Sequence, residues 1–190
     1  MTVVDDFSYL SVLISIVLGL GVTSLLTGLA RVVQLRDRIK IYWPTLCWVV
    51  TLLLIHVQMW WSMFGLRRVA VWTFPLYAIT LLQPILLFFL SAVIWPDFDR
   101  DEALDLKANY WAQARWFFGI LLALVFVSLA RYLTFRGNFP EQGDFAFHML
   151  FIVAGVGALV FRSETYHKIV APLSVAIYVA YIAMLFMALR

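Results

Sequence analysis

Few side chains in this sequence could do chemistry, and they lie inside long apolar segments. His56 and Gln58 belong to the second apolar segment, and Gln83 stands near the middle of the third. Polar groups are costly to bury in hydrocarbon, so such residues usually face a partner, a cavity or a ligand. The imidazole of His56 is the only side chain at that depth that titrates near neutral pH. These three residues are therefore the first candidates for a functional site.

Pro84 adds another polar group at the same depth. A proline inside a helix has no N–H for the carbonyl one turn earlier, so the Thr80 carbonyl loses its helical partner. In a membrane that carbonyl needs a polar neighbour or water. Because consecutive spans run antiparallel, we expect His56 and Gln83 to lie at one depth and within reach of each other. Two interpretations follow: a structural hydrogen bond, or a pore or binding pocket formed by His56, Gln58, Thr80, Gln83 and Pro84.

A redox or metal centre is an alternative chemistry for the same region. Met59 and Met63 share a helical face with His56, and His148 stands near the start of the fifth apolar segment. Imidazole and thioether groups suit copper(I), and two facing histidines suit a b-type haem. Met and His at helical spacing also occur in ordinary packing, and no ligand motif accompanies them. We therefore predict no metal or cofactor and keep copper or haem b as the alternative.

One further histidine is read differently. His167 lies in a polar stretch between the last two apolar segments, beside Glu164 and Lys168. A histidine with charged neighbours in a short connection is typically in contact with water. We expect His167 to be a solvated surface group.

The composition of the chain requires a lipid environment around these residues. Of the 190 residues, 64% are hydrophobic and 13% are charged, against about 25% charged in soluble domains, and the mean hydropathy is +0.93. A soluble core of this size could not bury so much apolar surface. The sequence predicts an all-α, polytopic membrane bundle with one transmembrane domain over residues 1–190. Its partner is the lipid bilayer, and the scattered basic residues indicate no nucleic acid.

Six segments have the length of a membrane span, about 20 residues. They cover residues 7–30, 43–64, 73–95, 111–133, 145–161 and 169–188. Lipid offers the backbone no hydrogen-bond partner, so each segment must be helical. Arg31, Arg36, Arg38 and Lys40 follow the first span, and nine of the 14 basic residues fall on that side. The positive-inside rule places the N-terminus outside. Short loops and a first span without a cleavage site favour a bacterial inner membrane.

Small residues recur at every fourth position of the first span: Ser11, Ser15, Gly19, Thr23 and Thr27. This spacing is typical of membrane helices whose backbones approach closely. One interpretation is packing within the bundle. The other is a contact with a second copy or another subunit, or the lining of a pathway. Small residues in the fifth and sixth spans likewise predict that these two spans form a close hairpin.

The ends of the first and fourth spans resemble each other. Leu29-Ala30-Arg31 recurs as Leu129-Ala130-Arg131, and a second arginine follows five residues later in both. Such an internal repeat would divide the chain into two inverted halves of three spans, an architecture of transporters and channels. The alternative is a coincidence in a sequence of low complexity.

These observations favour a small membrane channel or facilitator for an ion or small solute, assembled as a homo-oligomer. The first alternative is a non-catalytic accessory subunit of a larger membrane complex, and the second is a haem or copper redox protein that uses His56 and His148. The sequence contains no Walker loop, dinucleotide fingerprint, G-x-S-x-G or H-E-x-x-H motif. It also has a single cysteine, Cys47, which excludes an intramolecular disulfide. The missing motifs argue against an enzyme.

Overall fold

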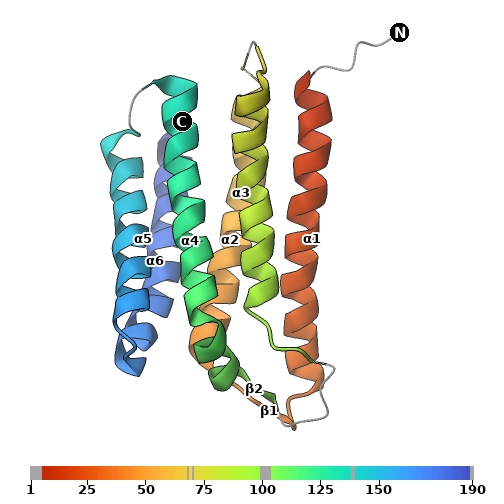
Figure 1. Cartoon of the computed structure of the whole chain (residues 1–190), viewed down its shortest axis with the longest axis vertical. Helices are drawn as coiled ribbons and strands as arrows, with labels where there is room; N and C mark the ends of the chain where they lie inside the picture. The colour runs from red at the N-terminus through yellow and green to blue at the C-terminus, as the bar shows by residue number, and fades with distance from the viewer. Residues whose placement is uncertain (1–5, 68, 70, 99–103, 138–139, 189–190) are drawn as a thin grey trace.

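The structure is a computed structural model and describes residues 6–67, 69, 71–98, 104–137 and 140–188. These residues form six long helices (Figure 1): α1 Asp6–Gln34, α2 Trp43–Leu66, α3 Phe74–Val93, α4 Leu106–Arg136, α5 Gln142–Val160 and α6 Glu164–Ala188. All six are long and apolar enough to cross a membrane. The predicted all-α bundle of six membrane-spanning helices is therefore confirmed.

Two helices begin five residues before the apolar segment that predicted them. The Asp105 carboxylate accepts hydrogen bonds from the backbone N–H groups of Lys107 and Ala108, at 2.8 and 3.1 Å, and so caps α4. With 31 residues, α4 is about 46 Å long, whereas the hydrocarbon core is about 30 Å thick. The first turns of α4 and α6 contain polar residues, so an apolar pattern does not detect them as helix.

The helices form two layers (Figure 1). In one layer α1, α3, α4 and α5 stand side by side in that order, and α2 and α6 lie behind them. At one end of the bundle, β1 (Ile39–Lys40) pairs in parallel with β2 (Leu104–Asp105). This pairing ties the connection after α1 to the start of α4.

The predicted inverted repeat stays a prediction. α1 packs extensively on α3, whereas their counterparts α4 and α6 share little contact, and α6 packs chiefly on α2. The predicted hairpin of the last two spans is a smaller contact than either helix makes elsewhere. α5 packs chiefly on α4, where Gly155 lies against the Leu122 side chain.

α1 contacts its neighbours through one face, on which buried residues recur at intervals of three and four positions. Its buried residues include Leu18, Gly21, Leu25 and Gly28. A Cβ added at Gly21 would overlap the imidazole of His56, and one added at Gly28 would overlap the indole of Trp95. These two glycines therefore let α1 approach large side chains of the rest of the bundle.

Most of the small-residue stripe of α1 lies outside this contact face. Ser11 and Ser15 are partly buried, but Gly19, Thr23 and Thr27 are exposed, and a Cβ added at Gly19 would meet no atom within 4 Å. The reason is geometric, because a step of four residues overshoots one turn of 3.6 residues by about 40°. The stripe therefore winds from the edge of the contact face onto the outer surface of the bundle.

Candidate functional site

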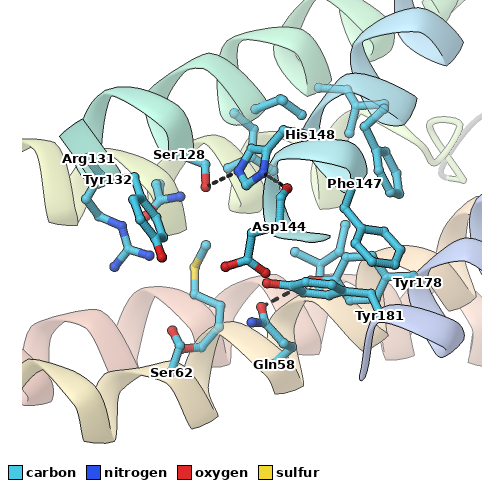
Figure 2. Close-up of a pocket in the computed structure, with 17 residues that line it drawn as sticks. Gln58, Ser62, Ser128, Arg131, Tyr132, Asp144, Phe147, His148, Tyr178 and Tyr181 are labelled. Atoms are coloured by element: carbon cyan, nitrogen blue, oxygen red, sulfur yellow. Dashed lines mark hydrogen bonds between the residues drawn. The ribbon is translucent and has the colours of Figure 1, made fainter. Parts of the chain in front are cut away.

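A pocket of about 160 Å³ lies between α2, α3, α4, α5 and α6. It occupies the half of the bundle where α4 ends and α5 begins. Figure 2 shows its side chains converging from several helices. The polar and charged residues that line it are Gln58, Ser62, Gln83, Ser128, Arg131, Tyr132, Asp144, His148, Tyr178 and Tyr181. The rest of the lining is apolar or aromatic, so the pocket is a polar site inside a hydrophobic bundle.

Helical spacing explains why these side chains meet. Arg131 and Tyr132 lie three and four residues after Ser128, and Phe147 and His148 lie three and four residues after Asp144. Residues three or four apart share one face of a helix. Because α4 and α5 are consecutive and antiparallel, their two polar faces come level and point into the same space (Figure 2).

His148 is held in a defined orientation at the wall of the pocket. Its Nδ1 lies 2.6 Å from the backbone carbonyl oxygen of Asp144, and its Nε2 lies 3.0 Å from Oγ of Ser128. A carbonyl oxygen only accepts hydrogen bonds, so Nδ1 carries the proton. In the neutral imidazole, Nε2 then accepts from the Ser128 hydroxyl. On the opposite wall, the Tyr178 hydroxyl donates to Oε1 of Gln58 at 3.1 Å.

Arg131 and Asp144 are the two charged residues of the pocket lining. Both are partly buried and come from different helices. No ion pair within 4 Å joins them, and neither is ion-paired to another residue in the described part of the chain. The Tyr181 hydroxyl lies close enough to interact with both. The pocket therefore offers a guanidinium and a carboxylate that are not neutralised by direct contact with each other.

The structure separates the residues that the sequence singled out. Gln58 and Gln83 line the pocket, whereas His56, Thr80 and Pro84 are not part of its lining. His56 and Gln58 are two positions apart, which turns their side chains about 200° from each other around α2. Gln58 therefore faces the pocket, and His56 faces α1.

His56 is deeply buried, at 2% exposure. Its Nδ1 donates to the Leu52 carbonyl at 2.7 Å, and its Nε2 packs beside Gly21 without a hydrogen-bond partner. No hydrogen bond joins His56 to Gln83 within the described ranges. The geometry gives His56 a packing role at the contact of α1 and α2.

Pro84 lies inside α3 and is buried, and the helix continues through it. Thr80 is also buried, and its hydroxyl donates to the Leu76 carbonyl one turn earlier, at 2.7 Å. Its side chain therefore bonds within α3.

The alternative metal ligands are also dispersed. Met59 and His148 line the pocket, Met63 is buried outside its lining, and His56 faces α1. Both ring nitrogens of His148 already form hydrogen bonds. The described residues contain no group of three or more His, Cys, Asp or Glu side chains that could hold a metal ion. The two histidines are thus not brought to one site.

The sequence interpretation missed Arg131 and Asp144 as members of a site. Both stand near the ends of predicted spans, where charged residues normally face the headgroups. The available signal was their spacing relative to Ser128 and His148, which places a polar face on each of two consecutive helices. The cost of burying a polar group singles out residues in the middle of a span, and so does not point to these two.

The expected exposure of His167 is wrong, since this residue is 1% exposed. It lies in the first turns of α6, and its Nδ1 is 2.8 Å from the hydroxyl of Tyr110. The rings of Trp111 and Phe118 pack around it, with centroids 4.7 and 5.4 Å away. Because α6 begins at Glu164, His167 is carried on the inner face of a helix and not in a loop.

α6 carries polar side chains along one face over most of its length. The face contains Glu164, His167, Ala171, Ser174, Tyr178 and Tyr181, at intervals of three and four residues. Glu164 pairs with Lys107 at 2.7 Å, and the Ser174 hydroxyl lies 3.0 Å from that of Thr51 in the core. Paired polar groups thus recur along α6 from the pocket to the opposite end of the bundle, interrupted by the apolar Ala171.

The burial of His167 gives the first prediction. His167→Ala should lower the free energy of unfolding by about 2–4 kcal/mol, because it empties a buried aromatic site and leaves the Tyr110 hydroxyl unpaired. Lys168→Ala, one residue along, removes only a partly exposed ion pair with Glu164 and should cost less than about 1 kcal/mol. Thermal unfolding of both variants in detergent measures the difference. Equal losses would contradict the inward orientation of His167.

Comparisons with protein-family models, with curated proteins and with solved structures find no match to this chain. The function must therefore be inferred from the pocket itself and from the polar face of α6 that leads away from it.

Proposed function

We propose that this protein is a membrane facilitator that carries a small polar solute across the bilayer and binds it in the pocket. The observation that carries the proposal is the pocket itself, with Arg131, Asp144 and His148 gathered inside a bundle of membrane-spanning helices. Charged and polar groups are expensive to retain within a membrane and typically mark a solute pathway. Sites between bundle helices are common for small ligands.

The polar face of α6 supplies the route beyond the pocket. On that route the Thr51 and Ser174 hydroxyls are 3.0 Å apart and buried, and nearer the other end His167 contacts Tyr110. A solute that leaves the pocket in this direction must separate α2 from α6 at Thr51 and Ser174. In this proposal, the facilitator is closed between its pocket and the end where α6 begins.

A disulfide across this closure tests the route. In a Cys47→Ser background, Thr51→Cys and Ser174→Cys place two thiols where hydroxyls 3.0 Å apart now stand, close enough for a bond of about 2.05 Å. Oxidation should abolish solute flux, measured by osmotic swelling of proteoliposomes, and a reducing agent should restore it. Each single-cysteine variant, oxidised in the same way, is the control and should keep its flux.

Unchanged flux through the oxidised double variant would show that solutes do not pass between α2 and α6. The wild-type protein is also tested with urea, glycerol, lactate and alanine. A protein that accelerates the passage of none of them would contradict the facilitator proposal.

The exposed part of the α1 stripe supports assembly. Gly19, Thr23 and Thr27 form a small-residue surface that faces away from the bundle, and such surfaces favour close helix contacts in membranes. We infer a homo-oligomer formed through α1. Docking to another membrane subunit, which would make the protein an accessory subunit, is the second candidate that this surface favours.

Two matched leucine variants separate assembly from folding. Gly19→Leu adds a side chain where nothing lies within 4 Å, so the folded monomer should remain and the oligomer should dissociate on mild detergent extraction. Gly21→Leu would overlap His56 and should destabilise the fold by about 1–3 kcal/mol or more. Size-exclusion chromatography and thermal unfolding measure the two effects. An oligomer unaffected by Gly19→Leu would contradict assembly through this surface.

The orientation follows from the basic residues at the end that holds β1 and β2. Arg36, Arg38 and Lys40 are exposed there, and the positive-inside rule supports a cytoplasmic location for this end in a bacterial inner membrane. The N-terminus and the first turn of α5 would then face outward. In a Cys47→Ser background, Glu141→Cys should react with an impermeant maleimide added to intact cells, and Arg38→Cys should not. The reverse pattern would invert the orientation.

A further inference from the structure

We infer that the pocket selects a small zwitterion, a solute that carries one ammonium and one carboxylate group. This inference rests on the proposed function, because it names the class of solute that the same pocket would bind. It follows from the charges of the lining, from the neutrality of the other lining groups and from the volume of the pocket.

The pocket lining carries one positively and one negatively charged side chain. Arg131 and Asp144 line one pocket, yet no ion pair joins them, and Figure 2 shows both turned toward the space between the helices. A guanidinium binds carboxylate through parallel N–H donors. A carboxylate accepts hydrogen bonds from an ammonium group. A ligand with both groups can satisfy both side chains at once.

Solutes with any other charge match the two charged residues of the pocket less well. A simple anion would bind Arg131 but would be repelled by Asp144, and a simple cation would meet the opposite problem. An uncharged solute would leave both partly buried charges without an opposite charge, since Tyr181 beside them offers only a neutral hydroxyl, and such a charge is costly away from water. Only a dipolar ion compensates both residues.

The remaining polar groups contribute hydrogen bonds. His148 donates through Nδ1 to the Asp144 backbone, and in its neutral form accepts from Ser128. Gln58 accepts from Tyr178, and the Tyr181 hydroxyl lies beside both charged residues. These groups add donors and acceptors without changing the balance of one positive and one negative charge.

The volume limits the size of the solute. The pocket measures about 160 Å³, and a cavity of about 150 Å³ is known to hold a benzene molecule. The pocket therefore accepts a ligand of about six non-hydrogen atoms. Short amino acids have this size and both charges.

Four compounds of nearly equal shape test the inference. Alanine is the zwitterion, lactate the anion, alaninamide the cation and lactamide the neutral molecule. Each is titrated against the purified full-length protein in detergent, with the shift of the thermal midpoint as the readout of binding. Alanine should bind at least tenfold more tightly than each of the other three, a difference of about 1.4 kcal/mol.

Two pocket variants should change the preference in opposite directions. Arg131→Gln removes the positive charge and should shift the preference from alanine toward alaninamide. Asp144→Asn removes the negative charge and should shift it toward lactate. Arg67→Gln is the matched control, because Arg67 lies over the Phe64 ring, outside the pocket lining. It should leave the order of the four compounds unchanged.

Several outcomes would overturn the inference. Equal binding of lactate and alanine by the wild-type protein would show an anion site, and this comparison needs no variant to fold. Binding of none of the four compounds would also overturn it, even if proteoliposomes transported a different solute. If alanine binds as expected but no solute crosses proteoliposomes, the ligand class stands and the facilitator proposal fails.

Discussion

The central constraint on this structure is that lipid cannot hydrogen-bond to a polar group. Several buried hydroxyl groups within the spans accordingly find acceptors in their own helix. Thr51, Thr80 and Ser91 each donate to the carbonyl four residues earlier, at 2.7–3.0 Å. Such a bond satisfies the hydroxyl within its own helix, wherever that helix lies. Only after this local requirement is met do polar groups become available to join helices.

Some polar contacts do join helices. The Ser24 hydroxyl donates to the Ser91 carbonyl at 3.1 Å, which links α1 to α3, and Thr51 contacts Ser174, which links α2 to α6. Hydrogen bonds of His148 to Ser128, Tyr178 to Gln58 and Tyr110 to His167 join further helix pairs. Helices also approach each other through complementary shape. Gly21 and Gly28 admit the His56 and Trp95 rings against the α1 backbone. Within lipid the hydrophobic effect does not drive helices together. Close packing of large rings against glycines stabilises these contacts instead.

Against this background the pocket is an exception. Its charged residues are held between helices without an ion pair, although the same chain pairs Glu164 with both Lys107 and Lys168 at the surface. Pairing Arg131 with Asp144 directly would satisfy both charges and fill the space between them. Under the proposed function, their separation would keep binding energy available for a solute that must be bound and released.

The sequence alone determined the membrane environment and the six spans, because hydropathy and length are local properties and lipid imposes a helix on each span. It also identified Gln58 and Gln83, which line the pocket. It could not determine which side chains share a site, because that depends on the rotation and the neighbours of each helix. Thus His56 turned toward α1, His167 was carried inward by an early helix start, and Gly19 faced outward.

Arg131 and Asp144 lie 13 positions apart, near the ends of two spans. Only the antiparallel packing of α4 on α5 brings them to one pocket, because a helix positions its side chains through contacts that its own sequence does not specify.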